Sequence, residues 1–318
     1  MPKLLIGGLG DVARRALPEL SSYFEVTTLS RSPTPNQNEG AVKHVALDLD
    51  AVIWTDEQKK CLAQRFDAVL YTAPPNASVD SNGDYDDVRL RCLLSFWQQS
   101  GVAPQWVVYV STTGVYGDCA GAWVDEATPL NPQSVRAKKR VAAERQWREF
   151  AYGSGAQVTV LRAPGIYALE RLPYVSVLAD SPVLLPDEDS FSNHIHADDL
   201  ARACVFFLNQ PTQDAACLPF EVFNVCDDEP ILMGEWMSAL ARVLQRAQPH
   251  QISREQMQAQ VSPMRWSFMR ESRRIRNEKL KSAGFELNYS SALAFVSAHA
   301  EVIRAYVAHH HGGEDNAQ

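Results

Sequence analysis

The sequence lacks the long apolar segment that a membrane-spanning helix requires, because none of its apolar runs approaches about 20 residues. Residues 4–9 form an apolar run that is too short and too rich in glycine for a secretory signal peptide. The six cysteines include no Cys-x-x-Cys pair, so they predict neither a disulfide framework nor a zinc site. We therefore expect a cytoplasmic protein with reduced thiols, no metal and no membrane association.

Positive charge is also scarce, since 30 Lys and Arg residues stand against 38 Asp and Glu residues, a formal net charge of -8. Such a surface repels nucleic acid and anionic lipid, which leaves a small molecule as the expected partner. No internal repeat or low-complexity tract is present. The apolar fraction of 46% and the charged fraction of 21% are typical of a folded globular protein.

Short apolar segments, typical of buried parallel strands, alternate with amphipathic helical segments. Strands are expected at residues 4–6, 26–29, 42–47, 68–71, 106–110, 158–161 and 220–225. Helices are expected from about residue 11 and at residues 85–100, 133–152 and 198–209. This alternation predicts an α/β fold with a Rossmann-type doubly wound parallel sheet.

The rhythm becomes irregular after about residue 165, which suggests two parts. We expect a dinucleotide-binding domain over residues 1–165, its sheet completed by residues 190–228. A smaller substrate-binding part is expected over residues 166–190 and 229–308. Residues 309–318 are polar and are expected to form a frayed tail.

The first expected strand leads directly into a glycine-rich turn with the spacing Gly7-x-x-Gly10-x-x-Ala13. Gly7 permits a tight turn, Gly10 lets backbone approach a pyrophosphate, and the small Ala13 lets the helix pack close to the strand. Asp11 and Val12 open the helix and are assigned to the same site, although a carboxylate beside phosphate is unfavourable unless Asp11 points outward. The alternative is a plain glycine-rich turn.

The end of the second strand selects the form of the cofactor. Ser30-Arg31-Ser32 replaces the acidic residue that usually binds the ribose hydroxyls of NAD, and these side chains suit a 2′-phosphate. NADP is therefore favoured over NAD, although Arg31 as a solvated loop charge is the alternative. Asp48 follows the third strand and is expected to contact adenine or, alternatively, to cap a turn. The cofactor assignment also includes Ala73 and Pro164.

Several segments together resemble the extended short-chain dehydrogenase/reductases, the NAD(P)-dependent epimerase/dehydratase family. The resemblance covers almost the whole chain and rests on residues 7–13, the Val-Tyr-Gly turn within 108–117, and residues 126–132, 161–167, 194–200 and 223–225. It implies an oxidoreductase, epimerase or dehydratase that acts on a polar carbonyl or nucleotide-sugar substrate. By analogy with many relatives it also implies a homodimer formed through the helices at residues 85–100 and 133–152.

The family's catalytic Ser/Thr, Tyr and Lys, often joined by an Asn, carry over incompletely. Thr112 matches the Ser/Thr and Asp86 the Asn, with Asp87 as the other choice. Counting from Glu144 places Arg136 at the Tyr and Arg140 at the Lys. The resemblance is therefore to an atypical branch that lacks the Tyr-x-x-x-Lys pair.

Arginine stays charged at physiological pH, so Arg136 is no general acid or base, but a fixed cation stabilises a developing oxyanion. Arg140 keeps the role of holding the nicotinamide ribose in this interpretation. The proton then comes from Tyr116, Tyr167, Asp86 or water. Alternatively, the two arginines lie on a solvated basic face with Lys138 and Lys139, and Thr112 only caps or packs.

Two further patterns have structural and functional interpretations. His194-x-His196 followed by Asp198-Asp199 is a metal candidate, but the aspartates are better explained as a helix cap. The basic residues within 265–281 suit either a solvated helix or the phosphates of a nucleotide-sugar. Our first functional hypothesis is an NADP-dependent enzyme, and the alternative is an NADP-binding sensor or regulatory protein without turnover.

Overall fold

A computed structural model of the chain describes residues 1–31, 42–51, 53–76, 79, 85–209 and 218–311. The chain divides into two compact units. The first unit comprises Met1–Gly117, Leu130–Ala163 and Leu200–Val225. The second comprises Asp118–Pro129, Pro164–Asp199 and Cys226–Gln318, so residues 118–129 belong to it although they were expected with the first.

The first unit is built on a parallel seven-stranded sheet with the order β12-β7-β5-β4-β1-β2-β3. These strands are the seven that the sequence predicts, which confirms the Rossmann-type fold. Their bounds are β1 (Lys3–Gly7), β2 (Glu25–Ser30), β3 (Val42–Ala46), β4 (Ala68–Tyr71), β5 (Trp106–Thr112), β7 (Gln157–Ala163) and β12 (Phe220–Asn224).

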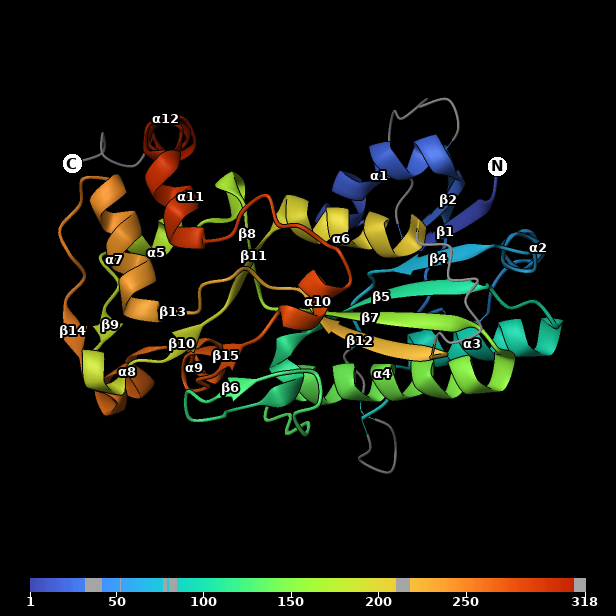
Figure 1. The fold of residues 1–318 in the computed structure, drawn as a ribbon, viewed down its shortest axis with the longest axis horizontal. Coiled ribbons are helices and arrows are strands. Elements are labelled where there is room, and N and C mark those ends of the chain that lie inside the picture. Colours follow the sequence, from blue (N-terminus) through green and yellow to red (C-terminus); the bar gives the residue numbers. More distant parts are fainter. Residues whose placement is uncertain (32–41, 52, 77–78, 80–84, 210–217, 312–318) are drawn as a thin grey trace. The chain divides into compact units, whose positions relative to one another are not determined.

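Helices cover both faces of this sheet, which explains why its central strands are apolar on both sides. Figure 1 shows α1 (Asp11–Tyr23) and α6 (Ala197–Asn209) over one face, with α3 (Val88–Ser100) and α4 (Val135–Ser154) over the other. The core on the α3 and α4 side includes the fully buried Trp97 and Trp147. Burial of each large aromatic side chain contributes about 4–6 kcal/mol at roughly 25 cal/mol per Å².

Polar caps fix where the helices that flank the sheet begin. The Asp87 carboxylate accepts a hydrogen bond from the Leu90 N–H at the start of α3, and the Ser134 hydroxyl accepts one from the Ala137 N–H at the start of α4. A further helix, α2 (Asp56–Leu62), was not predicted although Thr55 begins it with a capping box. None of the described helices combines the length and apolar content needed to cross a bilayer.

The second unit consists of short paired strands and helices. β8 (Gly165–Tyr167) pairs in parallel with β11 (His194–His196). The other pairs are β6 (Trp123–Val124) with β15 (Arg274–Ile275), β9 (Val183–Leu184) with β14 (Gln251–Ile252), and β10 (Phe191–Ser192) with β13 (Ile231–Leu232). The helices are α5 (Tyr174–Leu178), α7 (Met233–Val243), α8 (Arg254–Gln260), α9 (Pro263–Met269), α10 (Glu278–Ser282), α11 (Ala292–Ala298) and α12 (Ala300–His311).

Tyr167, Trp236 and Phe295 lie in the apolar core of this unit. Helix α12 extends to His311, so the expectation of a frayed tail is wrong for residues 309–311, and residues 312–318 lie outside the described part. The expected cap at Asp198 or Asp199 is also wrong, because both residues lie in the first turn of α6. The buried Asp199 carboxylate instead accepts hydrogen bonds from the N–H groups of Asn288 and Tyr289, at 3.0 and 2.8 Å.

Candidate functional site

A cavity of about 660 Å³ lies in the first unit, at the carboxyl ends of β1 to β4. Strand β1 has β2 and β3 on one side and β4 on the other, so the order of connection reverses between β1 and β4. Open α/β sheets bind ligands at such a switch point. The lining residues are Gly8, Leu9, Gly10, Arg14, Leu29, Ser30, Arg31, Leu47, Asp48, Leu49, Thr72, Ala73, Pro74, Pro75, Asn76 and Arg89.

Neither Gly7 nor Gly8, where β1 ends and the turn begins, has room for a side chain. A Cβ on Gly7 would lie 2.7 Å from a ring carbon of Tyr71. Gly8 has a φ of +98°, and a Cβ there would lie 2.7 Å from the backbone nitrogen of Ala73. Gly7 thus allows the turn to pack closely against Tyr71. Gly8 lines the cavity, although the glycine motif did not include it.

Packing does not require a glycine at position 10, because a Cβ there would meet no described atom within 4 Å. Gly10 lines the cavity and is the N-cap of α1, where no side chain accepts a hydrogen bond from the first turn. Uncapped N–H groups and the positive end of the helix dipole suit a phosphate. This cradle fits the pyrophosphate of a dinucleotide.

The side chains of Asp11 and Val12 are not among those that line the cavity, and that of Asp11 points outward, as the motif allowed. The Asp11 carboxylate pairs with the Arg15 guanidinium one turn along α1, at 3.0 Å. Val12 is buried in the core. The motif therefore marks the position of the turn correctly, but these two side chains support the helix instead of facing a ligand.

The loops after β2 and β3 supply a basic rim and one acid. Ser30 and Arg31 line the cavity, and Arg14 from α1 joins them, its Nε donating to the Leu9 carbonyl at 3.2 Å. Ser32 lies outside the described residues. Asp48 lines the cavity too, and its Oδ1 accepts from the Asp50 N–H at 3.0 Å, the turn contact that was the alternative interpretation.

The loop after β4 is tied to the glycine turn and to helix α4. The Thr72 hydroxyl donates to the Gly8 carbonyl at 2.6 Å, and the Ala73 N–H donates to the Gly7 carbonyl at 3.0 Å. The Lys139 ammonium donates to the Asn76 carbonyl at 2.7 Å. Lys139 is buried, which lowers its pKa, so it is no part of a solvated basic face.

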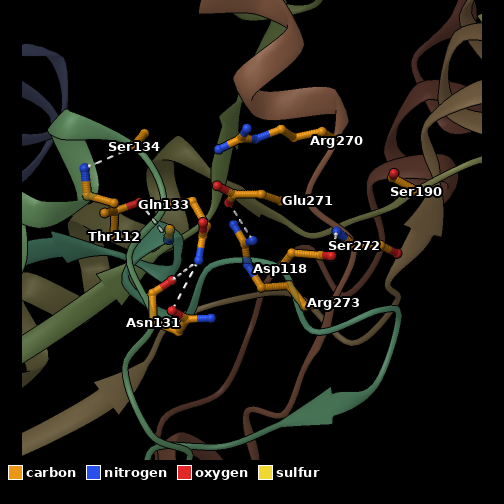
Figure 2. Close-up of polar contacts among 12 residues, drawn as sticks. Thr112, Asp118, Asn131, Gln133, Ser134, Ser190, Arg270, Glu271, Ser272 and Arg273 are labelled. Atoms are coloured by element: carbon orange, nitrogen blue, oxygen red, sulfur yellow. Dashed lines mark hydrogen bonds and ion pairs between the residues drawn. The ribbon is translucent and has the colours of Figure 1, made fainter. Parts of the chain in front are cut away.

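Thr112 is the last residue of β5, and Arg136 lies in the first turn of α4. The Thr112 hydroxyl accepts a hydrogen bond from the Gly114 N–H at 3.2 Å and so begins the turn η1 (Thr113–Tyr116) (Figure 2). Arg136 is exposed in the first turn of α4. Thr112 therefore does cap a turn, and its hydroxyl proton is still able to donate.

Arg140 turns toward the sheet. Its Nη1 donates to the Tyr109 hydroxyl at 2.9 Å and to the Val110 carbonyl at 2.8 Å, and the guanidinium lies 5.6 Å from the centre of the Tyr109 ring. Burial raises the pKa of Tyr109 to about 12, and the Arg140 charge opposes that rise. Arg140 thus anchors α4 to β5 at the carboxyl end of the sheet.

Asp86 lies away from the cofactor cavity. Its carboxylate pairs with Arg91 at 2.5 Å and accepts from the Gln146 amide, beside a second cavity of about 320 Å³ between α3 and α4. Asp87, the other choice for the family's Asn, is fully buried, and burial raises its pKa. Neither carboxylate lines the cavity that holds the glycine turn.

Tyr116 belongs to a buried polar network rather than to an accessible site. Its hydroxyl donates to the Asn224 amide oxygen and accepts from Arg162 Nη1, both at 2.8 Å. Arg162 in turn pairs with Glu144 at 2.7 Å, and Glu144 accepts from the Ser111 hydroxyl at 2.6 Å. All five side chains are buried, so the network joins β5, η1, α4, β7 and β12, and a structural role for Tyr116 is favoured.

Comparison with known proteins identifies the family. A model of the NAD dependent epimerase/dehydratase family matches residues 4–226. The chain belongs to this family. No curated protein matches the sequence significantly.

Solved structures with the same fold cover nearly the whole chain. A functionally unknown conserved protein from Silicibacter pomeroyi has 27% identity and a TM-score of 0.72, over 96% of this chain and 99% of its own. An epimerase/dehydratase from Methylobacillus flagellatus, itself assigned only by similarity, has 25% identity and a TM-score of 0.67, over 96% and 98%. MoeE5 in complex with UDP-glucose and NAD has 20% identity and a TM-score of 0.70, over 96% and 100%, which at this identity shows the fold alone.

Tyr167 lies in the core of the second unit. Its hydroxyl is buried with no hydrogen-bond partner in the described part of the chain, and burial, followed by the charge of Asp227, raises its pKa. His194 and His196 pack against the Tyr167 ring, and burial lowers the pKa of His194 to about 4. The two histidines are thus core residues. Pro164 is the first residue of a segment of this unit. Its assignment to the cofactor site stays a prediction.

The basic segment 265–281 is largely engaged within the second unit. Arg273 pairs with Glu271 at 2.8 Å, as Figure 2 shows, and Lys281 pairs with Asp228 at 2.6 Å. The Arg274 guanidinium lies 5.1 Å from the Trp123 ring centre and 4.9 Å from that of Phe191. The segment is therefore an ordered surface and not a uniformly solvated helix.

Sequence reasoning missed four residues around the cavity, namely Gly8, Arg14, Arg89 and Lys139. Gly8 and Arg14 carried a local signal, because they lie within and directly after the glycine motif. Arg89 and Lys139 lie far along the chain from the motif, and only the packing of α3 and α4 brings them to it.

Proposed function

We propose that this member of the epimerase/dehydratase family binds NADP and acts as an enzyme on a polar carbonyl compound or a nucleotide-linked sugar. The observation that carries the cofactor assignment is the basic rim formed by Arg31, which follows β2, and Arg14 of α1. A carboxylate there would repel a 2′-phosphate, whereas guanidinium and hydroxyl groups bind it. The family match supports the coarser assignment to NAD(P).

Each part of the cavity suits one part of the cofactor. The turn at Gly8 and Gly10 and the N–H groups of α1 would hold the pyrophosphate. Ser30 and Arg31, with Ser32 expected beside them, would hold the 2′-phosphate. Asp48 and Ala73 line the same cavity and would contact the adenine side.

The nicotinamide supplies hydride exchange when the cofactor is bound. In this proposal the Thr112 hydroxyl donates a hydrogen bond to the substrate oxygen. Arg136 stabilises negative charge that develops on that oxygen, because its guanidinium stays charged. Arg140, anchored by Tyr109 and Val110, orients the ribose. Since Tyr116 and Tyr167 are buried and Asp86 lies elsewhere, the proton is supplied by water.

The first test is a titration of the purified protein with NADPH and NADH, followed by nicotinamide fluorescence. Tight binding of NADPH with weaker binding of NADH supports the cavity and Arg31 assignments. Equal affinity removes the NADP preference, and no binding of either dinucleotide overturns the proposed function.

One observation favours a second candidate, an NADP-binding sensor without turnover. The positions of the family's Tyr and Lys are both arginine, at Arg136 and Arg140, and arginine is no general acid. Incubation of the protein with deuterium-labelled NADPH and a panel of carbonyl compounds and nucleotide-sugars distinguishes the two. Transfer of label to a bound compound supports the enzyme, and NADPH binding without any transfer supports the sensor.

The family resemblance also predicts a homodimer through α3 and α4. The second cavity lies between these helices, lined by residues such as Leu94 and Phe150. Light scattering of the purified protein tests this proposal, and a monomer at micromolar concentration would refute it.

A further inference from the structure

Arg89 is a feature of the cofactor cavity that neither the glycine motif nor the family's catalytic pattern includes. It lies in the first turn of α3, directly after the N-cap Asp87 and Val88. A cation there is unfavourable, because the amino end of a helix carries partial positive charge. Its guanidinium nevertheless lines the cavity, with only 14% of the side chain exposed. The contacts of Arg89 with Asp50 and Pro74 offset this unfavourable position.

Those contacts occupy the edge of the guanidinium and fix its plane. Nε donates to Asp50 Oδ1 at 3.0 Å, and Nη2 donates to Asp50 Oδ2, so the carboxylate is bound by two parallel hydrogen bonds. On the other side Nη1 donates to the Pro74 carbonyl at 2.7 Å. Asp50 follows β3 and Pro74 follows β4, so Arg89 bridges two loops that line the cavity.

The pairing also decides what kind of ligand group Arg89 can meet. The Arg89 hydrogen bonds are the main cause that lowers the pKa of Asp50, and the Arg31 charge contributes to the same shift. The Asp50 carboxylate thus largely neutralises Arg89. A phosphate placed against Arg89 would also face that carboxylate, which is unfavourable. Arg89 is therefore poorly suited to be the phosphate ligand.

The cavity that Arg89 lines also has an apolar component. Leu47 and Leu49 follow β3, and Pro74 and Pro75 follow β4, whereas the rest of the lining is mostly polar and includes Arg14, Arg31, Asp48, Thr72 and Asn76. Apolar side chains together with a fixed guanidinium plane match an aromatic base, because arginine stacks on aromatic faces. The polar part matches phosphates.

We propose that Arg89, held flat by Asp50 and Pro74, is the stacking platform for the adenine ring of the cofactor. This inference rests on the proposed binding of a dinucleotide in the cavity. It assigns two parts of the cofactor to two different arginines. Arg31 recognises the 2′-phosphate and so distinguishes NADPH from NADH. Arg89 recognises the adenine, which both cofactors share, and so contributes equally to the affinity for both.

The test compares the dissociation constants of NADPH and NADH for the full-length protein and its variants. We expect Arg89→Leu to weaken both cofactors by about ten-fold, the effect of losing one stacked base, with the ratio of the two constants unchanged. Arg89→Lys keeps a cation for Asp50 but has no plane, and we expect nearly the same loss. Arg91→Leu removes another ion pair of α3 outside this cavity, with Asp86, and should leave both constants unchanged.

Each other result contradicts the assignment in a recognisable way. A loss confined to NADPH would make Arg89 a phosphate ligand. Full affinity in Arg89→Lys with a loss in Arg89→Leu would show that the ion pair only holds the loops together. Unchanged affinity in both variants would leave Arg89 no role in binding. If the wild-type protein bound neither cofactor, the proposed function itself would fall, an outcome distinct from all of these.

Discussion

Replacing Asp227 by asparagine should remove a loss of stability that the wild-type protein suffers as the pH rises. Asp227 lies in the second unit and is only 2% exposed. Its Oδ2 accepts from the Ala292 N–H at 3.2 Å, and its Oδ1 has no hydrogen-bond partner among the described residues. Burial raises the pKa of Asp227 to about 8, and the charges of Asp228 and Glu229 add to the rise.

The sign of the effect follows from the direction of this shift. Between about pH 4 and pH 8 the carboxyl is protonated in the folded protein and ionised in the unfolded chain. The folded state then holds one more proton, so the free energy of unfolding falls as the pH rises, by about 1.4 kcal/mol per pH unit. Between pH 5 and pH 7 the loss from this one group is about 3 kcal/mol.

Asparagine reproduces the protonated form, because its amide oxygen accepts from the Ala292 N–H and its NH₂ group donates. The assay is urea unfolding of both proteins at pH 5, 6, 7 and 8. His194, whose lowered pKa of about 4 costs stability as the pH falls below about 6.5, is common to both proteins and cancels in the difference. The variant should gain on the wild type steadily toward pH 8. Parallel pH profiles would refute the inference that Asp227 is buried in its neutral form.

Three further predictions concern the cofactor cavity and the proposed chemistry. Arg31→Asp should weaken NADPH binding by about 100-fold, since it replaces a charge-assisted hydrogen bond by repulsion. NADH binding should change by no more than a few-fold in the same fluorescence titration. Equal losses for the two cofactors would contradict the NADP assignment. Gly8→Ala should cost about 2 kcal/mol in urea unfolding because of its φ of +98° and the contact with Ala73. The matched change Gly153→Ala, in the last turn of α4 where a Cβ meets open space, should not destabilise the protein. Arg136→Ala should lower turnover by about 100-fold on any substrate found, with NADPH affinity kept, and an unchanged rate would return Arg136 to the solvated face.

Most of the sheet could be predicted from the sequence because its strands are buried on both faces. β4, Ala68–Tyr71, is completely buried, and such short apolar segments between helical ones have few other interpretations. Helix α2 was missed because its seven residues give too little periodicity. The expected helix cap at Asp199 failed for a different reason. The same residue type caps helices and binds loop N–H groups, and here the distant residues 288 and 289 supply those groups.

The cavity was predictable only where its residues are close in sequence to a motif. Gly10 and Arg31 follow directly from the strand, turn and helix pattern. The side chains of Asp11 and Val12 pair with Arg15 and pack the core, so the motif leaves only their backbone N–H groups as predicted ligands for a phosphate. The alternative interpretation placed Lys139 on a solvated face with its neighbours, since helical spacing does not show which side of α4 meets the loop at Asn76.

The proposed replacement of the family's Tyr and Lys by arginine need not disturb the binding of the cofactor, because the two proposed functions depend on different elements. The cavity is formed by loops that follow β1 to β4 and by the first turns of α1 and α3. The candidate catalytic residues lie instead on β5 and α4. Arg140 contacts β5 through Tyr109 and Val110, while the neighbouring Lys139 contacts the cavity loop at Asn76. Helix α4 therefore contacts the cavity loop through one residue, while other residues of the same helix carry the proposed catalytic roles. Binding and turnover can change independently, so tight NADPH binding by itself would not distinguish an enzyme from a sensor, whereas transfer of label from NADPH would.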